Sequence, residues 1–549
     1  MRILIIGAVA SGTSAAAKAR RNNEDAEIVI YEKDEFISYS GCGMPYYLGG
    51  VIESAEDLAP RDADFFKNKY NVDVFTRHEV IDINCDKKTL QVKDLSTQKV
   101  FFDNYDILVI ATGAKASVPP IKGVENSNVF LLRNMLDMNK IKSFIDNSKP
   151  KTVAIIGTGF IGLEVCENLK RLGIEVSLIE KLPQVTPNLD ADMSVYVKKH
   201  IEKNGVTVLT NASAQEITNN SVILQEGKTI KADMVLIATG VRPETSLASL
   251  SGVALGQSGA IRVNEKMQTN IADVYACGDC IEVPHILTGK PVYRPLGSTA
   301  NKTGRIAGDS ITGGDLTFRG VLSTGIFKVF DMTVAQTGLS EREAKEHNYG
   351  IEVSHNIMPN KPEYMGGKDM VIKAIADKDS GRLLGVQIVG YEGVDKRIDV
   401  FVTAITFGAK AADLFHLDLA YSPPFSTAKD PVMYTGMILE NAINRGRKLV
   451  TAEGLDDITK SGQKFTIIDA RVAAQYEKEH IFAAENIPHS KLRECANNID
   501  KDCIVVTYCN RGITGNAAQN ILLNKGFDKV YNISGGHKHY KIVHSKNSE

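Results

Sequence analysis

The chain has 549 residues, a mass of 59.8 kDa and a formal net charge of −2, and this length predicts about three or four domains rather than one hydrophobic core. A hydrophobic content of 43% with 24% charged residues gives no electrostatic reason to expect nucleic acid or an anionic membrane as a partner. The first apolar run is too short for a secretion signal and no later run approaches the roughly 20 residues of a membrane helix, so we expect a cytoplasmic protein.

Two units of strand, glycine turn, helix and strand follow one another. The first has strands near residues 2–6 and 27–31, a glycine turn from Gly7, and Glu32 at the end of the second strand. The second repeats this order with strands near 153–156 and 175–179, a turn from Gly157, and Glu180. Later strands end in Ala-Thr-Gly in both units, at 111–113 and 238–240. This order places a pyrophosphate at a helix N-terminus and a carboxylate beside a ribose, so we predict two dinucleotide sites.

The two glycine turns differ in how closely they match the dinucleotide-binding fingerprint. Val9 replaces the middle glycine of the first turn, whereas Gly157-Thr-Gly159-Phe-Ile-Gly162 is a complete fingerprint. Glu180 favours NADH, because a 2′-phosphate beside a carboxylate costs about 1 kcal/mol in water and about 4 kcal/mol at an effective dielectric constant of 20. Lys181 follows directly and softens that penalty, so NADPH stays possible.

Eight cysteines in so long a chain are too sparse for a disulfide scaffold. Cys277 and Cys280 have CxxC spacing, but they overlap the segment that ends in Gly278-Asp279, and we interpret them as structural. No metal-ligand pattern appears among the eleven histidines, so we expect no metal.

A third domain of mixed strands, near 325–330 and 384–390, and a long apolar helix near 400–407 follow residue 320. A polar connector precedes a small α/β pattern that begins at Phe465. There a buried strand at 504–508 leads to Cys509 and a loop before a helix at 516–524. Loop amides and a helix dipole at this position would cradle an anion such as a thiolate or persulfide.

The two turns, both Ala-Thr-Gly segments and Gly278-Asp279 resemble the pyridine-nucleotide disulfide oxidoreductase family over about residues 1–445. The resemblance implies an α/β fold with two Rossmann-like domains, FAD in the first and NADH in the second, and an α+β dimerisation domain. The implied FAD residues are Gly7, Val9, Ala10, Gly12, Glu32, Lys33, Val80, Ala111, Thr112, Gly113, Arg133 and Asp279. The implied NADH residues are Gly157, Gly159, Phe160, Ile161, Gly162, Glu180 and Gly240. Phe160 matches the aromatic residue that covers the flavin, with an ordinary core aromatic as the alternative.

Classical members carry two cysteines five positions apart, but the position five residues after Cys42 is Tyr47. The segment around Cys42 resembles the single-cysteine branch, which contains coenzyme A disulfide reductases, coenzyme A persulfide reductases, and NADH oxidases and peroxidases. A thiol of pKa about 8.5 is only about 3% ionised at pH 7. We expect a helix start after Cys42 to lower its pKa by about two units.

Residues 419–431, Leu-Ala-Tyr-Ser-Pro-Pro-Phe-Ser-Thr-Ala-Lys-Asp-Pro, resemble the coenzyme A disulfide reductase signature. The resemblance implies that Tyr421 and Tyr364 approach Cys42 from the partner subunit of a homodimer and donate protons to a leaving thiolate. Tyr421 packing the dimer interface is the alternative. The residues that fall on the family's coenzyme A positions are Lys18, Arg21, Ser38, Asn301 and Lys429. The lysine and arginine could equally be solvated helix charges.

The C-terminal segments 465–471, 479–488 and 504–514 resemble a rhodanese domain. The resemblance implies that Cys509 carries sulfane sulfur in a loop with Arg511, Gly512 and Thr514; a degenerate domain used only for docking is the alternative. The expected domains are FAD-binding (1–114 and 241–320), NADH-binding (115–240), dimerisation (321–446), a linker (447–462) and rhodanese-like (463–549).

These resemblances predict an FAD-dependent NADH:coenzyme A persulfide or polysulfide reductase, also active on coenzyme A disulfide, with Cys42 and Cys509 as its two sulfur centres. An NADH oxidase or peroxidase with Cys42 as a sulfenic acid is the alternative. A sulfur carrier with a merely structural flavin domain is a third interpretation.

Overall fold

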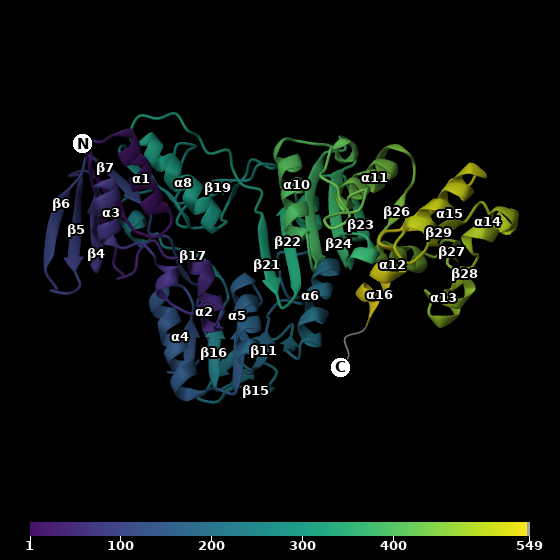
Figure 1. The fold of residues 1–549 in the computed structure, drawn as a ribbon, viewed down its shortest axis with the longest axis horizontal. Coiled ribbons are helices and arrows are strands. Elements are labelled where there is room, and N and C mark those ends of the chain that lie inside the picture. Colours follow the sequence, from purple (N-terminus) through teal and green to yellow (C-terminus); the bar gives the residue numbers. More distant parts are fainter. Residues whose placement is uncertain (546–549) are drawn as a thin grey trace. The chain divides into compact units, whose positions relative to one another are not determined.

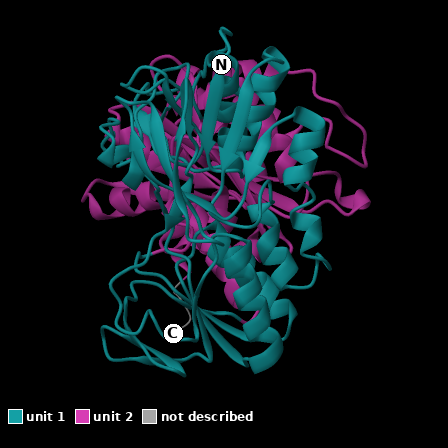
Figure 2. Ribbon diagram, turned by 90° about the vertical axis from the view of Figure 1, so that its left-hand side faces the viewer, with its two compact units in different colours: residues 1–183, 206–321 teal, residues 184–205, 322–549 magenta. Residues whose placement is uncertain are grey.

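The computed structural model describes residues 1–545, which form mixed α/β structure (Figure 1). Two compact units divide the chain, one of residues 1–183 and 206–321 and one of residues 184–205 and 322–549 (Figure 2). Within the described part of the chain, the structure contains no helix with the length and apolar character needed to cross a membrane.

The first unit begins with a parallel sheet in the order β18-β7-β1-β2-β3. Its strands are β1 (Arg2–Ile6), β2 (Glu27–Tyr31), β3 (Asp73–Phe75), β7 (Ile107–Ile110) and β18 (Val274–Ala276). β1 is central and its apolar side chains are buried on both faces, as a parallel strand requires. Helix α1 (Ser11–Asn22) follows β1 and packs against α8 (Gly297–Ser310). The expected first strand–turn–helix–strand order is confirmed.

A second parallel sheet in this unit has the order β12-β11-β10-β16-β9. Its strands are β9 (Val129–Leu131), β10 (Thr152–Ile156), β11 (Glu175–Ile179), β12 (Thr207–Leu209) and β16 (Met234–Ile237), with helices α4 (Met135–Ser148) and α5 (Phe160–Arg171). β10 pairs with β11 and β16 as β1 pairs with β2 and β7. The internal repeat seen in the sequence is therefore a repeat of topology.

Shorter elements complete the first unit. They are η1 (Gly41–Gly43), α2 (Met44–Leu48), η2 (Glu56–Leu58), α3 (Ala63–Tyr70), β4 (His78–Asn84), β5 (Thr89–Asp94), β6 (Val100–Asn104), β8 (Ala114–Ala116), β13 (Ala214–Ile217), β14 (Ser221–Leu224), β15 (Thr229–Lys231), β17 (Val241–Pro243), α7 (Ser246–Leu250), β19 (Val283–Pro284) and β20 (Pro291–Val292). β4, β5 and β6 form an antiparallel sheet, as do β13, β14 and β15.

The second unit contains an antiparallel sheet in the order β21-β22-β25-β24-β23. Its strands are β21 (Gly325–Val329), β22 (Met332–Gly338), β23 (Ile351–Pro359), β24 (Asp369–Asp377) and β25 (Leu383–Gly390). Helices α10 (Val394–Thr406), α11 (Pro431–Asn444) and α6 (Ala191–Lys203) pack on it. α9 (Glu341–Glu346) and η3 (Glu363–Met365) lie in its connections, and η4 (Ala411–His416) lies between α10 and α11.

The C-terminal part of this unit has a parallel sheet in the order β26-β30-β29-β27-β28. Its elements are β26 (Leu449–Val450), α12 (Ala452–Lys460), β27 (Phe465–Asp469), α13 (Ala473–Lys478), β28 (Ala484–Asn486), α14 (His489–Cys495), η5 (Ala496–Asn498), β29 (Ile504–Tyr508), α15 (Ile513–Asn524), β30 (Val530–Ile533) and α16 (Gly536–His544). β26 and α12 occupy the segment expected to be a linker, and β26 pairs with β30.

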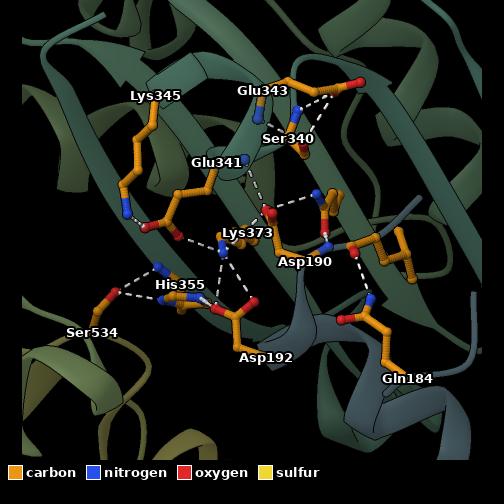
Figure 3. Close-up of polar contacts among 12 residues, drawn as sticks. Gln184, Asp190, Asp192, Ser340, Glu341, Glu343, Lys345, His355, Lys373 and Ser534 are labelled. Atoms are coloured by element: carbon orange, nitrogen blue, oxygen red, sulfur yellow. Dashed lines mark hydrogen bonds and ion pairs between the residues drawn. The ribbon is translucent and has the colours of Figure 1, made fainter. Parts of the chain in front are cut away.

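Buried charges join α6, the antiparallel sheet and the C-terminal part. Lys373 of β24 is 1% exposed, and its amine lies 3.1 Å from Asp190, 2.9 Å from Asp192 and 2.8 Å from Glu341 (Figure 3). His355 of β23 has its Nε2 2.7 Å from Asp192 and its Nδ1 3.0 Å from the Ser534 hydroxyl. Ser534 directly follows β30, so this network holds the C-terminal part against the sheet.

Candidate functional site

Glu32 and Glu180 hold equivalent places in the two nucleotide units. Glu32 accepts hydrogen bonds from the amides of Ala8, at 2.8 Å, and Asp34, at 3.0 Å. Glu180 accepts hydrogen bonds from the Thr158 amide, at 3.0 Å, and its hydroxyl, at 2.6 Å. Each carboxylate is thus fixed against its glycine turn, where ribose hydroxyls of a dinucleotide would lie.

The glycine turns pack as the motif requires. Gly7 and Gly157 have φ of 104° and 106°, and a Cβ on either would overlap the carbonyl of Ala111 or Ala238. A Cβ on Gly159 would meet no atom within 4 Å, so the second turn faces open space there, and the same holds for Gly240, which follows β16. The backbone at this turn can therefore approach a pyrophosphate closely.

Arg133 and Asp279, both expected at the FAD site, lie together. An Arg133 Nη2 is 3.3 Å from an Asp279 carboxylate oxygen. Burial raises the pKa of Asp279, and the charge of Arg133 opposes that rise. Other expected residues of this site have ordinary surroundings: Val80 is buried in β4 and the Thr112 hydroxyl donates to the Glu244 carbonyl at 2.6 Å.

Cys42 lies in η1 and is the exposed one of the eight cysteines, all of which belong to the described residues. Helix α2 follows but has only five residues, so its dipole is small. Desolvation by the surrounding protein, and then the charges of Glu164 and Asp279, raises the pKa of the Cys42 thiol. The expectation that the chain's own residues lower this pKa is therefore wrong.

Glu164 of α5 gives this site an ionisable carboxyl that the sequence analysis did not single out. Burial, and then the charge of Glu167, raises the pKa of Glu164 to about 7. Burial, and then Glu164, raises the pKa of Tyr46 to about 12. The surroundings that this chain provides for Cys42 are therefore acidic.

Tyr364 and Tyr421 lie on two loops of the second unit and are 76% and 53% exposed. Arg397 of α10 is 1% exposed and forms hydrogen bonds to both of these segments. Its Nη2 donates to the Asn360 carbonyl, at 2.9 Å, on the Tyr364 loop. The same nitrogen donates to Ser426, at 3.2 Å, and Asp430, at 2.9 Å, on the Tyr421 loop. One buried guanidinium therefore sets the spacing of the two tyrosine loops.

The expected coenzyme A residues differ in the partners that their side chains already have in this chain. The Lys18 amine lies 2.9 Å from the Asp309 carboxylate, so its charge is neutralised by an ion pair within the chain. Arg21 lies 5.8 Å from the centroid of the Tyr70 ring. Lys69 of α3, which was not among the expected residues, lies 5.6 Å from the same centroid, so the two cations lie at the same ring. Ser38 has a φ of 48°. The Asn301 side chain accepts from Ser14, and Lys429 lies over the Tyr434 ring.

Cys509 lies at the carboxyl end of β29 and is 5% exposed. Its carbonyl accepts a 2.8 Å hydrogen bond from the His537 amide at the start of α16. Gly536 has a φ of 61°, and a Cβ there would overlap the Cys509 carbonyl oxygen and crowd the amides of Arg511 and Gly512. The turn before α16 therefore fixes the Cys509 loop. α15 begins at Ile513, three residues before the expected start, so Thr514 lies in its first turn.

Two arginines border the Cys509 loop. Arg471 follows β27 and forms a bidentate pair with Asp469, in which Nε donates to Oδ1 at 2.9 Å and Nη2 donates to Oδ2 at 2.6 Å; its Nη1 donates to the Asn510 side-chain oxygen at 3.2 Å. Arg511 pairs with Asp369, at the start of β24, at 2.9 Å. Arg511, which was expected in the Cys509 loop, is therefore held by a carboxylate of the antiparallel sheet.

Three segments of the chain match known families. Residues 1–299 match the family described as pyridine nucleotide-disulphide oxidoreductase, residues 324–431 match its dimerisation domain, and residues 451–542 match the rhodanese-like domain. The chain belongs to the pyridine nucleotide-disulphide oxidoreductase family. The resemblance and the fold class expected from the sequence are confirmed.

Similar proteins of this family span most or all of the chain. The crystal structure of reduced Bacillus anthracis CoADR-RHD has 39% sequence identity and a TM-score of 0.96, with 99% of this chain and 98% of that chain covered. A Methanocaldococcus jannaschii protein named NADH oxidase is 37% identical, covering 79% of this chain and 97% of its own length. A Pyrococcus furiosus protein named NAD(P)H sulfur oxidoreductase (CoA-dependent) is 35% identical, covering 80% and 99%.

One grouping in this family member has no counterpart in the sequence analysis. Asp192, His355 and His539 bring ligand atoms within 4.8 Å of one another, although they come from three distant segments. The Lys373 amine also lies 2.9 Å from Asp192, so a cation already occupies one side of this carboxylate. Spacing along the chain could not reveal the grouping, because only the fold brings its members together.

Proposed function

We propose that this chain is an FAD-dependent NADH reductase of coenzyme A persulfide or polysulfide, which also reduces coenzyme A disulfide. One observation carries the proposal: Cys42 is exposed beside the nucleotide units without a second cysteine five residues away, and the same chain holds Cys509 in a rhodanese-like loop. A lone cysteine either pairs with a substrate thiol or becomes a sulfenic acid, and the rhodanese-like loop in the same chain favours the first. Names of similar proteins, which include CoA-dependent sulfur oxidoreductase and CoADR-RHD, support this choice.

The residues present fit the two nucleotides. Glu32 and Glu180 are backbone-held carboxylates at ribose positions, and Gly159 leaves room for a pyrophosphate. When bound, NADH supplies a hydride and FAD relays its two electrons to sulfur. Glu180 favours NADH over NADPH, because its carboxylate would repel the 2′-phosphate of NADPH.

Cys42 performs the sulfur chemistry in this proposal. Its thiolate attacks the outer sulfur of the persulfide, the S–S bond breaks, and Cys42–S–SH forms while coenzyme A takes a proton and leaves as a thiol. Two electrons that originate from NADH, with one proton, then release the outer sulfur as H₂S and restore the Cys42 thiolate. The net reaction of the persulfide is CoA–S–SH + NADH + H⁺ → CoA–SH + H₂S + NAD⁺. Because this chain alone raises the pKa of Cys42, we propose that bound groups and the partner subunit stabilise the thiolate.

The proposed active form is a cytoplasmic homodimer in which Tyr364 and Tyr421 of one chain serve Cys42 of the other. Their high exposure in the single chain supports an interface there. Arg21 and Lys429 are the cations proposed for the coenzyme A phosphates, and Ser38 and Asn301 the polar contacts. Coenzyme A affinity unchanged in an Arg21→Ala, Lys429→Ala double variant would refute this pocket.

Oxidase activity is the second candidate, because one relative is named NADH oxidase. Both functions use Cys42, as a thiolate with persulfide or as a sulfenic acid with oxygen. Anaerobic assays with coenzyme A persulfide, and aerobic assays without it, separate them by the sulfide formed per NADH. We expect Cys42→Ser to lose both activities and Cys509→Ser to lose only the use of sulfur donors.

A further inference from the structure

A cavity of about 590 Å³ lies within the second unit, between its antiparallel sheet and two helices of its C-terminal part. Its volume is in the range of small-molecule sites, about 300–1,000 Å³. Neither Cys42 nor Cys509 is among the described residues that line it. The kind of ligand that fits this cavity is therefore set by its walls and not by the sulfur chemistry proposed above.

One wall of the cavity is apolar and belongs to the antiparallel sheet. Ile357, Val371 and Val389 come from β23, β24 and β25, and all three are buried and line the cavity. Ile357 is the register partner of Val371, and Val371 is the register partner of Val389, so their side chains form one row across the sheet. Met332 of β22 and Tyr391, directly after β25, line the cavity as well. This wall can bury the carbon body of a ligand, which a small inorganic ion lacks.

Two helices of the C-terminal part form a second wall. Gln475 and Lys478, three residues apart, line the cavity from α13. Lys538, Lys541 and Ile542 line it from α16, at spacings of three and four residues. Because these are the spacings of residues on one helix face, each helix turns a lysine-bearing face to the cavity.

The lysines of this second wall outnumber the carboxylates that pair with them. The Lys541 amine lies 2.7 Å from Glu479, and the Lys538 amine lies 3.0 Å from Asp369. Lys478 is exposed and lies within ion-pair distance of no carboxylate among the described residues. One lysine charge is therefore left for a ligand, which favours a ligand with a single negative charge.

Arg471 and His537 add to this preference, since both line the cavity. Burial, and then the charge of Arg471, lowers the pKa of His537. A further positive charge is therefore disfavoured beside these side chains, and a cationic ligand is excluded by the same repulsion.

We propose that this cavity binds a monoanionic organic acid with an aromatic or branched apolar body. The apolar row would bury the body, and Lys478 would pair with the acid group. Such a ligand contacts the antiparallel sheet and the C-terminal part together, so its binding stabilises the folded chain. The site uses none of the residues proposed above for the nucleotides, coenzyme A or the two thiols, and no covalent bond forms or breaks in it.

The test is equilibrium binding to the full-length, FAD-loaded enzyme, measured by isothermal titration calorimetry with three probes. 1-Naphthylacetate has both the apolar body and the charge, 1-naphthylacetamide has the body alone, and acetate has the charge alone. We expect 1-naphthylacetate to bind, and the amide to bind about fivefold more weakly, because an exposed ion pair contributes up to about that factor. Acetate should show no binding, because it has too little apolar surface to bury.

Two substitutions separate the two walls. Val371→Phe fills the apolar row and should weaken the binding of both naphthyl probes about tenfold or more. Lys478→Glu should weaken only 1-naphthylacetate, by about fivefold or more, so that the acid no longer binds more tightly than the amide. Lys460→Glu, which changes an exposed lysine of α12, is the matched charge control and should leave every affinity unchanged.

The FAD content of each variant, and reduction of its flavin by NADH, report whether it is folded. Should Val371→Phe fail to fold, Val371→Ala takes its place and should weaken both naphthyl probes through lost apolar contact. The site is overturned if 1-naphthylacetate does not bind the wild type, or if its affinity is unchanged in the Val371 and Lys478 variants. Acetate that binds as tightly as 1-naphthylacetate overturns the apolar body, and equal wild-type affinities for acid and amide overturn the charge preference.

Discussion

Replacing Arg397 with methionine should remove the link that fixes the positions of the Tyr364 and Tyr421 loops relative to each other. Both nucleotide units should stay folded. Methionine keeps the apolar stem of the side chain but removes the hydrogen bonds to Asn360, Ser426 and Asp430. Asp430 is 3% exposed and would stay buried, because its side chain also accepts from the Val432 amide at the start of α11.

The expected cost follows from this geometry. Removing one partner of a buried ion pair destabilises a protein by about 3–5 kcal/mol, since the other charge is left without compensation. Arg397→Lys keeps a charge near Asp430 but cannot span both loops, so a loss of about 1–3 kcal/mol is expected, the usual cost of a buried group left unpaired. Arg342→Met is the matched control, because Arg342 is 69% exposed and its pair with Glu346 is worth about 0–1 kcal/mol.

Denaturant unfolding measures these free energies, and steady-state assays measure the consequence for catalysis. If the loops position Tyr364 and Tyr421, kcat with coenzyme A disulfide should fall in Arg397→Met and recover partly in Arg397→Lys, with hydride transfer from NADH to the flavin unchanged. If the free energy of unfolding of Arg397→Met lies within about 1 kcal/mol of the wild-type value, the reasoning is refuted, because an exposed ion pair contributes that much. So would a normal kcat.

Three further predictions concern other charged groups and the sulfur loop. Glu164→Gln removes a charge that raises the pKa of Cys42, so alkylation of Cys42 by iodoacetamide near pH 8, close to the usual thiol pKa of about 8.5, should accelerate; an unchanged pH profile would contradict this. Burial, and then His355, hold the pKa of His539 well below its usual value of about 6.5, so the unfolded chain binds a proton that the folded one does not. Stability should therefore fall as pH drops below about 6.5, and His539→Phe should flatten that part of the stability profile; an identical slope in the variant would count against it. Gly536→Ala places a Cβ against the Cys509 carbonyl and should abolish sulfur loading while NADH-driven disulfide reduction continues; normal loading, measured by intact mass, would be inconsistent with the fixed loop.

Much of the framework was accessible from the sequence because its signals are local. The strands at Arg2–Ile6 and Thr152–Ile156 are short apolar runs followed by glycine turns, and both are central strands of parallel sheets. Glu32 and Glu180 were found because a carboxylate at a strand end has a fixed distance from its turn. In each case, the signal lies within about 30 residues of chain, the length of one βαβ unit.

The charges that the fold buries were not accessible in this way. Arg397 and Lys373 look like surface residues of a helix and a strand, and only tertiary packing brings Asp430 and Asp192 to them. The pKa of Cys42 was predicted in the wrong direction for the same reason. Its local helix start proved to be five residues long, and the dominant charge comes from Glu164 on a distant helix.

The most direct test of the central role of Cys42 is the amount of sulfide released per NADH oxidised. The assay uses coenzyme A persulfide as the sole acceptor and excludes oxygen. Wild-type enzyme should release one sulfide for each NADH oxidised, as the balanced reaction requires, and Cys42→Ser should release none while its flavin is still reduced by NADH. Continued sulfide release by Cys42→Ser, or NADH oxidation by the wild type without sulfide, would contradict a reductase that works through this single thiol.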